Sequence, residues 1–268
     1  MLALQLRAEG RLDLDAPRDG RGATLRHLLA HRAGLPDYGA LSDYHAAVAR
    51  RDPPWSRAEL EARSGAAGPL PAPPAPWRYS NIGYARARDA VEAAAGADLA
   101  TLLETRLAGP LGLGSLRLAR TVADMARLAP PGLADYDPGW VLHGCLTGTA
   151  ADAAALLHAL ATGRLLGPAD LAEMQAATPL GGPVPGRPWT RAGYGLGLMI
   201  GEMAGAGPVW GHSGAGPCAA CAVYHVPGPG LTLAAFAADA SEAGPEHALA
   251  RRAAALIGRA ARQPSQRS

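Results

Sequence analysis

Short apolar runs separated by glycine and proline fill the last third of this chain. The runs cover residues 194–200, 209–213, 218–226 and 231–237. Such runs between turn residues are typical of strands, and residues 227–230 (Pro-Gly-Pro-Gly) form a clear hairpin signal. An amphipathic pattern then continues from about Glu246 to Arg259. The end of the chain is therefore predicted to form an antiparallel sheet that carries one terminal helix.

Helical patterns occupy most of the preceding chain. Thr24 and Thr149 are candidate helix caps, and Gly96 is a candidate stop for a helix that begins at Ile82. Further helices are expected at residues 41–51, 56–64, 99–107 and 171–176. The chain is thus predicted to be a single α+β domain over residues 1–268. Its helical region covers about 20–190, and its sheet with the terminal helix covers about 191–260.

Charge and hydropathy exclude two classes of function. All 25 basic residues are arginines, and they alternate with 23 acidic residues along the chain, so no basic stripe for nucleic acid is present. No apolar run approaches the length of a membrane-spanning helix. A small molecule or a peptide is the expected partner. Oligomeric state stays open. Localisation stays open too: no signal peptide begins at Met1, which makes the cytoplasm the default expectation, but a signal peptide would lie upstream of an incomplete N-terminus.

Cysteine and histidine spacings give weak metal signals. The chain has three cysteines, Cys145, Cys218 and Cys221, which is too few for a disulfide framework. Cys218 and Cys221 lie in an apolar, strand-like run, which favours packing over redox or metal chemistry. His27 and His31 are one helical turn apart, but no third ligand accompanies them, which favours a structural role near the helix end. We expect no metal and no cofactor.

Residues 77–81 (Trp-Arg-Tyr-Ser-Asn) form the first candidate site. Tyr79 can transfer a proton, and the Asn81 amide can both donate and accept a hydrogen bond. On an extended loop the two side chains project to the same side. The alternative is a simple helix entry, with Ser80 or Asn81 as the cap.

Residues 211–215 (Gly-His-Ser-Gly-Ala) form the second candidate site. His212 could polarise or protonate a bound group, or it could be an inert histidine at a strand end. The same stretch resembles the G-x-S-x-G elbow of α/β-hydrolases, with Asp239 and His247 following Ser213. That elbow should open a helix, whereas a strand and a hairpin are expected here, so we do not favour it.

Together these motifs resemble one family. The ordered landmarks are residues 24–36, 77–84, 147–152, 194–198 and 211–214. They are similar to those of the class C β-lactamase-like serine hydrolases, which include D-alanyl-D-alanine carboxypeptidases and esterases. The resemblance extends from about Leu4 to Arg259. It implies a β-lactamase/transpeptidase-like antiparallel sheet flanked by helices, beside a mostly helical region.

The resemblance also implies roles for individual residues. Tyr79 would share proton transfer with a lysine, and Asn81 would hold the substrate amide or ester. His212 stands where many relatives carry the lysine of K-T-G. Ser213 and Gly214 would contact the substrate.

The oxyanion and the nucleophile complete the implied mechanism. The backbone N–H of Ala215 would be one oxyanion donor. A serine would form the acyl-enzyme with an amide, peptide, ester or β-lactam.

The nucleophile motif S-x-x-K is absent, because the sequence contains no lysine. Arginine cannot replace that lysine, since its guanidinium stays protonated. Residues 1–10 read as the last turns of a helix, and the resemblance sets the missing serine on the order of eight residues before Met1. We therefore expect an N-terminally incomplete enzyme that lacks its first strands and the start of the nucleophile helix. That loss would expose a sheet edge. The alternative is a catalytically inactive binding or vestigial member of the same fold.

Overall fold

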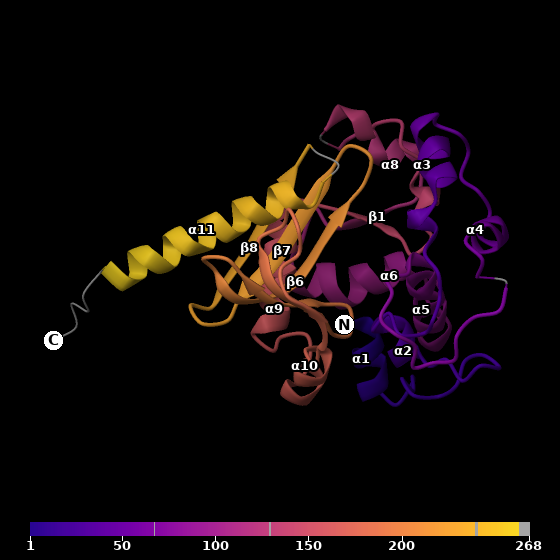
Figure 1. The fold of residues 1–268 in the computed structure, drawn as a ribbon, viewed down its shortest axis with the longest axis horizontal. Coiled ribbons are helices and arrows are strands. Elements are labelled where there is room, and N and C mark those ends of the chain that lie inside the picture. Colours follow the sequence, from indigo (N-terminus) through magenta and orange to yellow (C-terminus); the bar gives the residue numbers. More distant parts are fainter. Residues whose placement is uncertain (67, 129, 239–240, 263–268) are drawn as a thin grey trace. The chain divides into compact units, whose positions relative to one another are not determined.

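The computed structural model describes residues 1–66, 68–128, 130–238 and 241–262. The chain divides into two compact units. The helical unit comprises Met1–Gly148 and Leu165–Asp170, and the sheet unit comprises Thr149–Arg164 and Leu171–Ser268. Figure 1 labels their elements.

Short helices build most of the helical unit. They are α1 (Leu2–Ala8), α2 (Leu25–Leu29), α3 (Ser42–Ala49), α4 (Arg57–Arg63), α5 (Asn81–Ala95), α6 (Leu99–Leu103), α7 (Gly109–Leu111) and α8 (Val122–Met125). Short 3-10 helices form η1 (Tyr38–Ala40), η3 (Pro131–Leu133) and η4 (Pro138–Trp140), and a π-helix forms η2 (Glu104–Ala108). Helix α10 (Pro168–Met174) begins in this unit and ends in the sheet unit.

The predicted helix caps are confirmed. Thr24 caps α2 by accepting a hydrogen bond from the backbone N–H of His27, and the His27 ring accepts one from the N–H of Thr24. Gly96 ends α5 with a φ of +62°, a left-handed conformation that glycine adopts without a steric penalty. Thr149 caps helix α9 (Ala150–Ala161) through a 3.2 Å bond from the N–H of Asp152.

A two-stranded sheet in the helical unit was not predicted. Strand β1 (Arg117–Ala119) pairs antiparallel with β2 (Cys145–Thr147). Each strand has three residues. A run this short does not display a period-2 pattern, so sequence reasoning had no signal for it.

The sheet unit is a six-stranded antiparallel meander. Its strands are β3 (Thr178–Gly181), β4 (Trp189–Tyr194), β5 (Met199–Met203), β6 (Gly207–Ala215), β7 (Ala220–Val226) and β8 (Leu231–Ala237), and each pairs with its neighbour in sequence. Helix α11 (Ala243–Arg262) runs across the sheet, as Figure 1 shows, and contacts β7 and β8. The core beneath it includes Trp189, Tyr224 and Leu249. The predicted antiparallel sheet with a packed terminal helix is confirmed.

One predicted strand is wrong. Residues 194–200 do not form one strand, because β4 ends at Tyr194, a tight turn occupies residues 195–198, and β5 begins at Met199. The N–H of Gly195 donates to the carbonyl of Leu198 at 2.9 Å, and Gly197 has a φ of +79°. Leu196 and Leu198 are both buried, so their alternation with glycine imitates a strand pattern. The sheet also begins earlier than residue 191, with β3 at Thr178.

No helix among the described residues is long and apolar enough to cross a membrane.

Close approach of two strands requires glycine at position 211. A Cβ at Gly211 would overlap the carbonyl oxygen of Val223 and lie 2.8 Å from the Cα of Tyr224 in β7. We expect Gly211→Ala to lower the free energy of unfolding by about 3 kcal/mol, because the backbone of β7 must move. Denaturation in urea measures this loss. Gly228→Ala is the control, since a Cβ there meets nothing within 4 Å, and an equal loss in both variants would contradict the steric argument.

Candidate functional site

The Trp77–Tyr79 segment leads directly into α5. Ser80 caps this helix, because its Oγ accepts a 3.0 Å hydrogen bond from the N–H of Gly83. Ser80 itself is buried, whereas the neighbouring Tyr79 side chain is 38% exposed. Asn81 is the first residue of the helix and is partly exposed. The helix cap, Ser80, and the candidate proton-transfer residue, Tyr79, are therefore adjacent in the backbone.

His31 holds residues 78–80 in place through its side chain and its backbone carbonyl. It is buried and has a φ of +56°, a left-handed conformation that is unusual for a residue other than glycine. Its Nδ1 accepts a 3.1 Å bond from the N–H of Ser80, and its carbonyl accepts one from the N–H of Arg78. The rings of Tyr79 and Tyr84 lie 4.4 Å and 4.9 Å from the His31 ring. Sequence reasoning had noticed His31 only for its spacing from His27.

Asp37 anchors the other side of the same stretch. The N–H of Asn81 donates to Asp37 Oδ1 at 3.0 Å, and Ser80 Oγ donates to the carbonyl of Pro36 at 2.6 Å. A Cβ at Gly39 would lie 3.2 Å from the Asn81 amide nitrogen, so glycine leaves space beside that amide. Asp37 has no motif signal in the sequence, because its partner lies 44 positions away.

In the sheet unit, His212 lies in β6 and is held at both ring nitrogens. Its Nδ1 faces the carbonyl oxygen of Ser213, and its Nε2 lies 3.0 Å from the hydroxyl of Tyr194. A carbonyl can only accept, so the neutral ring carries its proton on Nδ1 and accepts the Tyr194 hydroxyl proton at Nε2. Burial lowers the pKa of His212, which keeps the ring neutral at pH 7.

Ser213 lies next to His212 in the strand, so its side chain is on the opposite face of β6. The side chain is buried, and its Oγ accepts a 2.9 Å bond from Arg187 Nη2. No helix begins after Ser213, since β6 continues to Ala215 and β7 follows, which argues against the α/β-hydrolase elbow. His247 bonds the carbonyl of Gly186, and Asp239 lies outside the described residues.

Arg187 belongs to a polar network behind β6. Glu246 of α11 has no solvent exposure, and it accepts bonds from Arg187 Nε at 2.7 Å, Trp189 Nε1 at 3.1 Å and the hydroxyl of Tyr224 at 2.9 Å. Burial and the neighbouring Glu246 charge raise the pKa of Tyr224 well above its usual value. No local sequence pattern predicts this network, because its members are spread over 59 positions.

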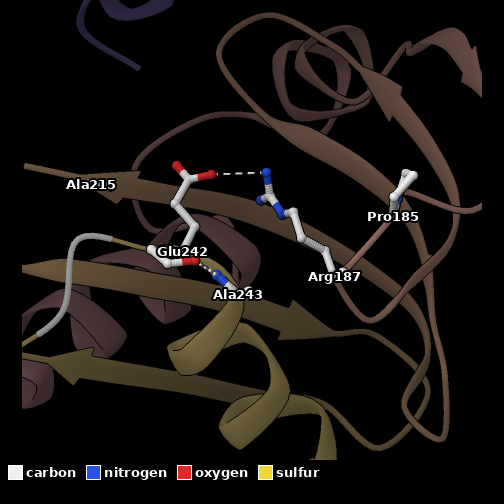
Figure 2. Close-up of a pocket in the computed structure, with 7 residues that line it drawn as sticks. Pro185, Arg187, Ala215, Glu242 and Ala243 are labelled. Atoms are coloured by element: carbon white, nitrogen blue, oxygen red, sulfur yellow. Dashed lines mark hydrogen bonds and ion pairs between the residues drawn. The ribbon is translucent and has the colours of Figure 1, made fainter.

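An open pocket of about 480 Å³ adjoins this network. Figure 2 shows Arg187 paired with Glu242 inside it, across from Ala215. The Arg187 Nη1 to Glu242 Oε2 distance is 2.8 Å. Since Arg187 faces two carboxylates, Glu242 and Glu246, the charged side chains of this cluster sum to one negative charge.

The remaining motif residues lie at the end of β6. Gly214 pairs with Cys221, and Ala215 pairs with Ala220 of β7. The cysteines are free thiols, and burial raises the pKa of both Cys145 and Cys221, which keeps them protonated and unreactive. Among the described residues, no group of three or more His, Cys, Asp or Glu side chains is arranged to hold a metal ion.

The sequence-predicted residues thus fall into two groups. Tyr79 and Asn81 flank the cap of α5 in the helical unit, and residues 212–215 end β6 in the sheet unit. A beta-lactamase family model matches residues 1–257. The chain belongs to the beta-lactamase family. The family resemblance and the α+β fold class predicted from the sequence are both confirmed.

Solved structures of this family share the fold. A D-stereospecific amidohydrolase from Streptomyces sp. superposes with a TM-score of 0.78 and 27% identity, over 94% of this chain and 82% of that chain. A penicillin binding protein from Bacillus halodurans gives a TM-score of 0.72 with 20% identity, over 94% of this chain and 82% of that one.

A similar sequence is Penicillin-binding protein 4* of Bacillus subtilis (strain 168), which is 31% identical over 125 residues. This match covers 45% of the present chain and 26% of that protein, so it spans about a quarter of that relative's length.

The buried carboxylate of Glu246 should dominate the stability of the sheet unit. We expect Glu246→Gln to lower the free energy of unfolding by about 3 kcal/mol, because it removes the fully buried one of the two carboxylates that pair with Arg187. Glu202→Gln breaks the exposed Arg191–Glu202 pair, and its cost should stay below about 1 kcal/mol. Chemical denaturation of both variants makes the comparison. Equal losses would show that burial of the pair is not the cause.

The depressed pKa of His212 makes stability depend on pH. The imidazole of His212 binds a proton more readily in the unfolded chain than in the folded chain. Its contribution to the free energy of unfolding is therefore full above about pH 6.5 and falls as the pH drops below that value. We expect His212→Gln to flatten the decline in unfolding free energy between pH 7 and pH 5. Denaturation curves at several pH values measure it. A variant that keeps the full wild-type slope would assign the dependence to other groups.

Proposed function

We propose that these 268 residues carry the proton-transfer and oxyanion-binding parts of a serine hydrolase that works through an acyl-enzyme. The observation that carries this proposal is Tyr79, an exposed tyrosine on a segment that His31 and Asp37 hold rigidly from two sides. A candidate catalytic group needs both access to substrate and a fixed position. Tyr79 meets these requirements, whereas Tyr84 donates its hydroxyl to the carbonyl of Leu29.

Each remaining residue has one role in this proposal. Tyr79 shares proton transfer with a lysine of the nucleophile motif, and Asn81 binds the substrate amide or ester. His212 polarises the bound group, and Ser213 and Gly214 contact the substrate from β6, Ser213 through its backbone because its side chain is buried on the opposite face. The N–H of Ala215 donates to the oxyanion, an interaction whose loss typically costs about 2.7–4 kcal/mol of transition-state stabilisation.

An amide or peptide is the substrate class that we favour, ahead of an ester or a β-lactam. The supporting observation is the 27% identity to the D-stereospecific amidohydrolase from Streptomyces sp. over 94% of this chain. Departure of an amine requires a proton, which Tyr79 shares with the lysine of the nucleophile motif in this proposal.

A non-catalytic binding or vestigial protein of the same fold is the second candidate. It is favoured by the absence of lysine from all 268 positions, because the acyl-enzyme route of this family needs Ser-x-x-Lys. The two candidates differ in one expectation. The hydrolase carries Ser-x-x-Lys in the polypeptide that its native host makes, whereas the binding protein does not.

N-terminal sequencing and mass measurement of the protein from its native host separate these candidates. If that protein contains Ser-x-x-Lys, we expect it to hydrolyse amino acid amides, and we expect Tyr79→Phe to lower kcat by about 10²–10⁴-fold. The 268 residues alone should be inactive in the same assay.

Tyr84→Phe is the matched control, since it makes the same change on a tyrosine that also packs against His31. Hydrolysis of a chromogenic ester by the 268 residues, at a rate that survives Tyr79→Phe, would refute this assignment of the site.

A further inference from the structure

The open pocket beside β6 begins at the residue that the proposed function assigns to the oxyanion. Its lining includes Ala215, Arg187 and Glu242, and all of these residues belong to the sheet unit. Figure 2 shows them around the pocket. A substrate whose carbonyl oxygen binds the N–H of Ala215 would therefore place the groups next to that carbonyl at the pocket.

All three nitrogens of the Arg187 guanidinium are engaged. Nε donates to Glu246 Oε2 at 2.7 Å, and Nη2 donates to Ser213 Oγ at 2.9 Å. Nη1 lies 2.8 Å from Glu242 Oε2. An anionic ligand would have to compete with two carboxylates that are already in place.

The start of α11 offers an anion few donors. The N–H of Ala243 donates to Ser241 Oγ at 3.3 Å, and the N–H of Glu246 donates to the carbonyl of Glu242 at 3.2 Å. Pro245 has no N–H. Three of the first four residues of this helix therefore cannot donate to a bound anion.

The charged groups around the pocket leave an excess of negative charge. Arg187 contributes one positive charge, whereas Glu242 and Glu246 contribute one negative charge each. The N-terminus of α11 adds roughly half a positive charge, so about half a negative charge remains. Glu246 has no solvent exposure, whereas the side chain of Glu242 is 29% exposed. Oε2 of Glu242 faces Arg187, and Oε1 has no hydrogen-bond partner among the described residues, so Glu242 presents the excess charge to a ligand.

The charge of Glu242 acts at the end of β6. Burial lowers the pKa of His212, and the charge of Glu242 opposes part of that lowering. Burial raises the pKa of Cys221, which pairs with Gly214, and the charge of Glu242 adds to that rise. The field of Glu242 therefore reaches the stretch of β6 where the proposed function places the substrate.

We propose that Glu242 binds the ammonium group of the substrate, and that this pocket selects cationic substrates over anionic ones. In an amino acid amide the ammonium group is on the carbon next to the scissile carbonyl, so it lies near Ala215 when the carbonyl does. Oε1 of Glu242 can accept from the ammonium while Oε2 stays on Arg187. A carboxylate at the same place would meet the excess negative charge. The inference rests on the proposed function, because it takes Ala215 as the oxyanion donor.

Binding to the 268 residues tests the subsite without hydrolysis. The probes at about pH 6.5 are leucinamide, which is cationic, N-acetyl-leucinamide, which is neutral, and N-acetyl-leucine, which is anionic. In ¹⁵N NMR titrations we expect leucinamide to shift the backbone N–H signals of Gly186, Ala215 and Ala243. The two acetylated probes should bind there at least about tenfold more weakly.

Variants separate charge recognition from a structural defect. Glu242→Gln should weaken leucinamide binding by about tenfold and strengthen N-acetyl-leucine binding, because it removes the excess negative charge. A structural defect would weaken both. Glu242→Asp keeps the charge and should keep the preference for leucinamide. Glu202→Gln is the matched control, since it makes the same change at a carboxylate that pairs with Arg191 in β5, and it should alter no affinity.

Three binding results would overturn the inference. They are failure of leucinamide to bind, signal shifts only at residues outside the pocket, and a preference for leucinamide that survives Glu242→Gln.

Hydrolysis by the polypeptide that the native host makes separates this inference from the proposed function. If leucinamide binds as expected but is not hydrolysed, the hydrolase proposal is wrong and the cation subsite stands. If leucinamide and N-acetyl-leucinamide are hydrolysed with equal kcat/KM, and Glu242→Gln changes neither value, the hydrolase proposal stands and the cation subsite is wrong.

Discussion

One buried carboxylate holds the sheet unit together. Glu246 of α11 satisfies an arginine, a tryptophan and a tyrosine that come from before β4, from β4 and from β7. A buried charge is tolerated only when it is paired and hydrogen-bonded, so α11 can dock in one register. Through Arg187 the same carboxylate reaches Ser213, and thereby fixes the strand that presents His212 on its other face. Helix docking and the geometry of the candidate site therefore share one cause.

His31 performs the equivalent task in the helical unit. Its left-handed backbone and buried ring cost conformational energy, which the surrounding bonds to Ser80 and Arg78 offset. This residue joins the end of α2 to the start of α5 across 49 positions. The position of Tyr79 consequently depends on both α2 and α5.

Local signals were sufficient for much of the fold. Capping residues such as Thr24, Thr149 and Gly96 act on neighbouring N–H groups, so their sequence context predicts their structure. The turn at residues 195–198 was mistaken for a strand, because its leucines are buried by tertiary packing that mimics strand alternation. The motifs identified Tyr79 and His212. Their supports, Asp37, Tyr194 and Arg187, depend on contacts between distant segments, which no local pattern encodes.

The cap of α5 also bears on how the motif at residues 77–81 should be interpreted. Ser80 begins the longest helix of the helical unit, and its backbone is continuous with that of Tyr79 and Asn81. Replacing Ser80 would remove the cap bond to the N–H of Gly83 and destabilise the start of α5, whatever its effect on chemistry. A protein of this fold without catalytic activity would still use the serine of the Trp-Arg-Tyr-Ser-Asn sequence to begin α5. The serine of this motif is therefore evidence of a helix start and is not, by itself, evidence of an active enzyme.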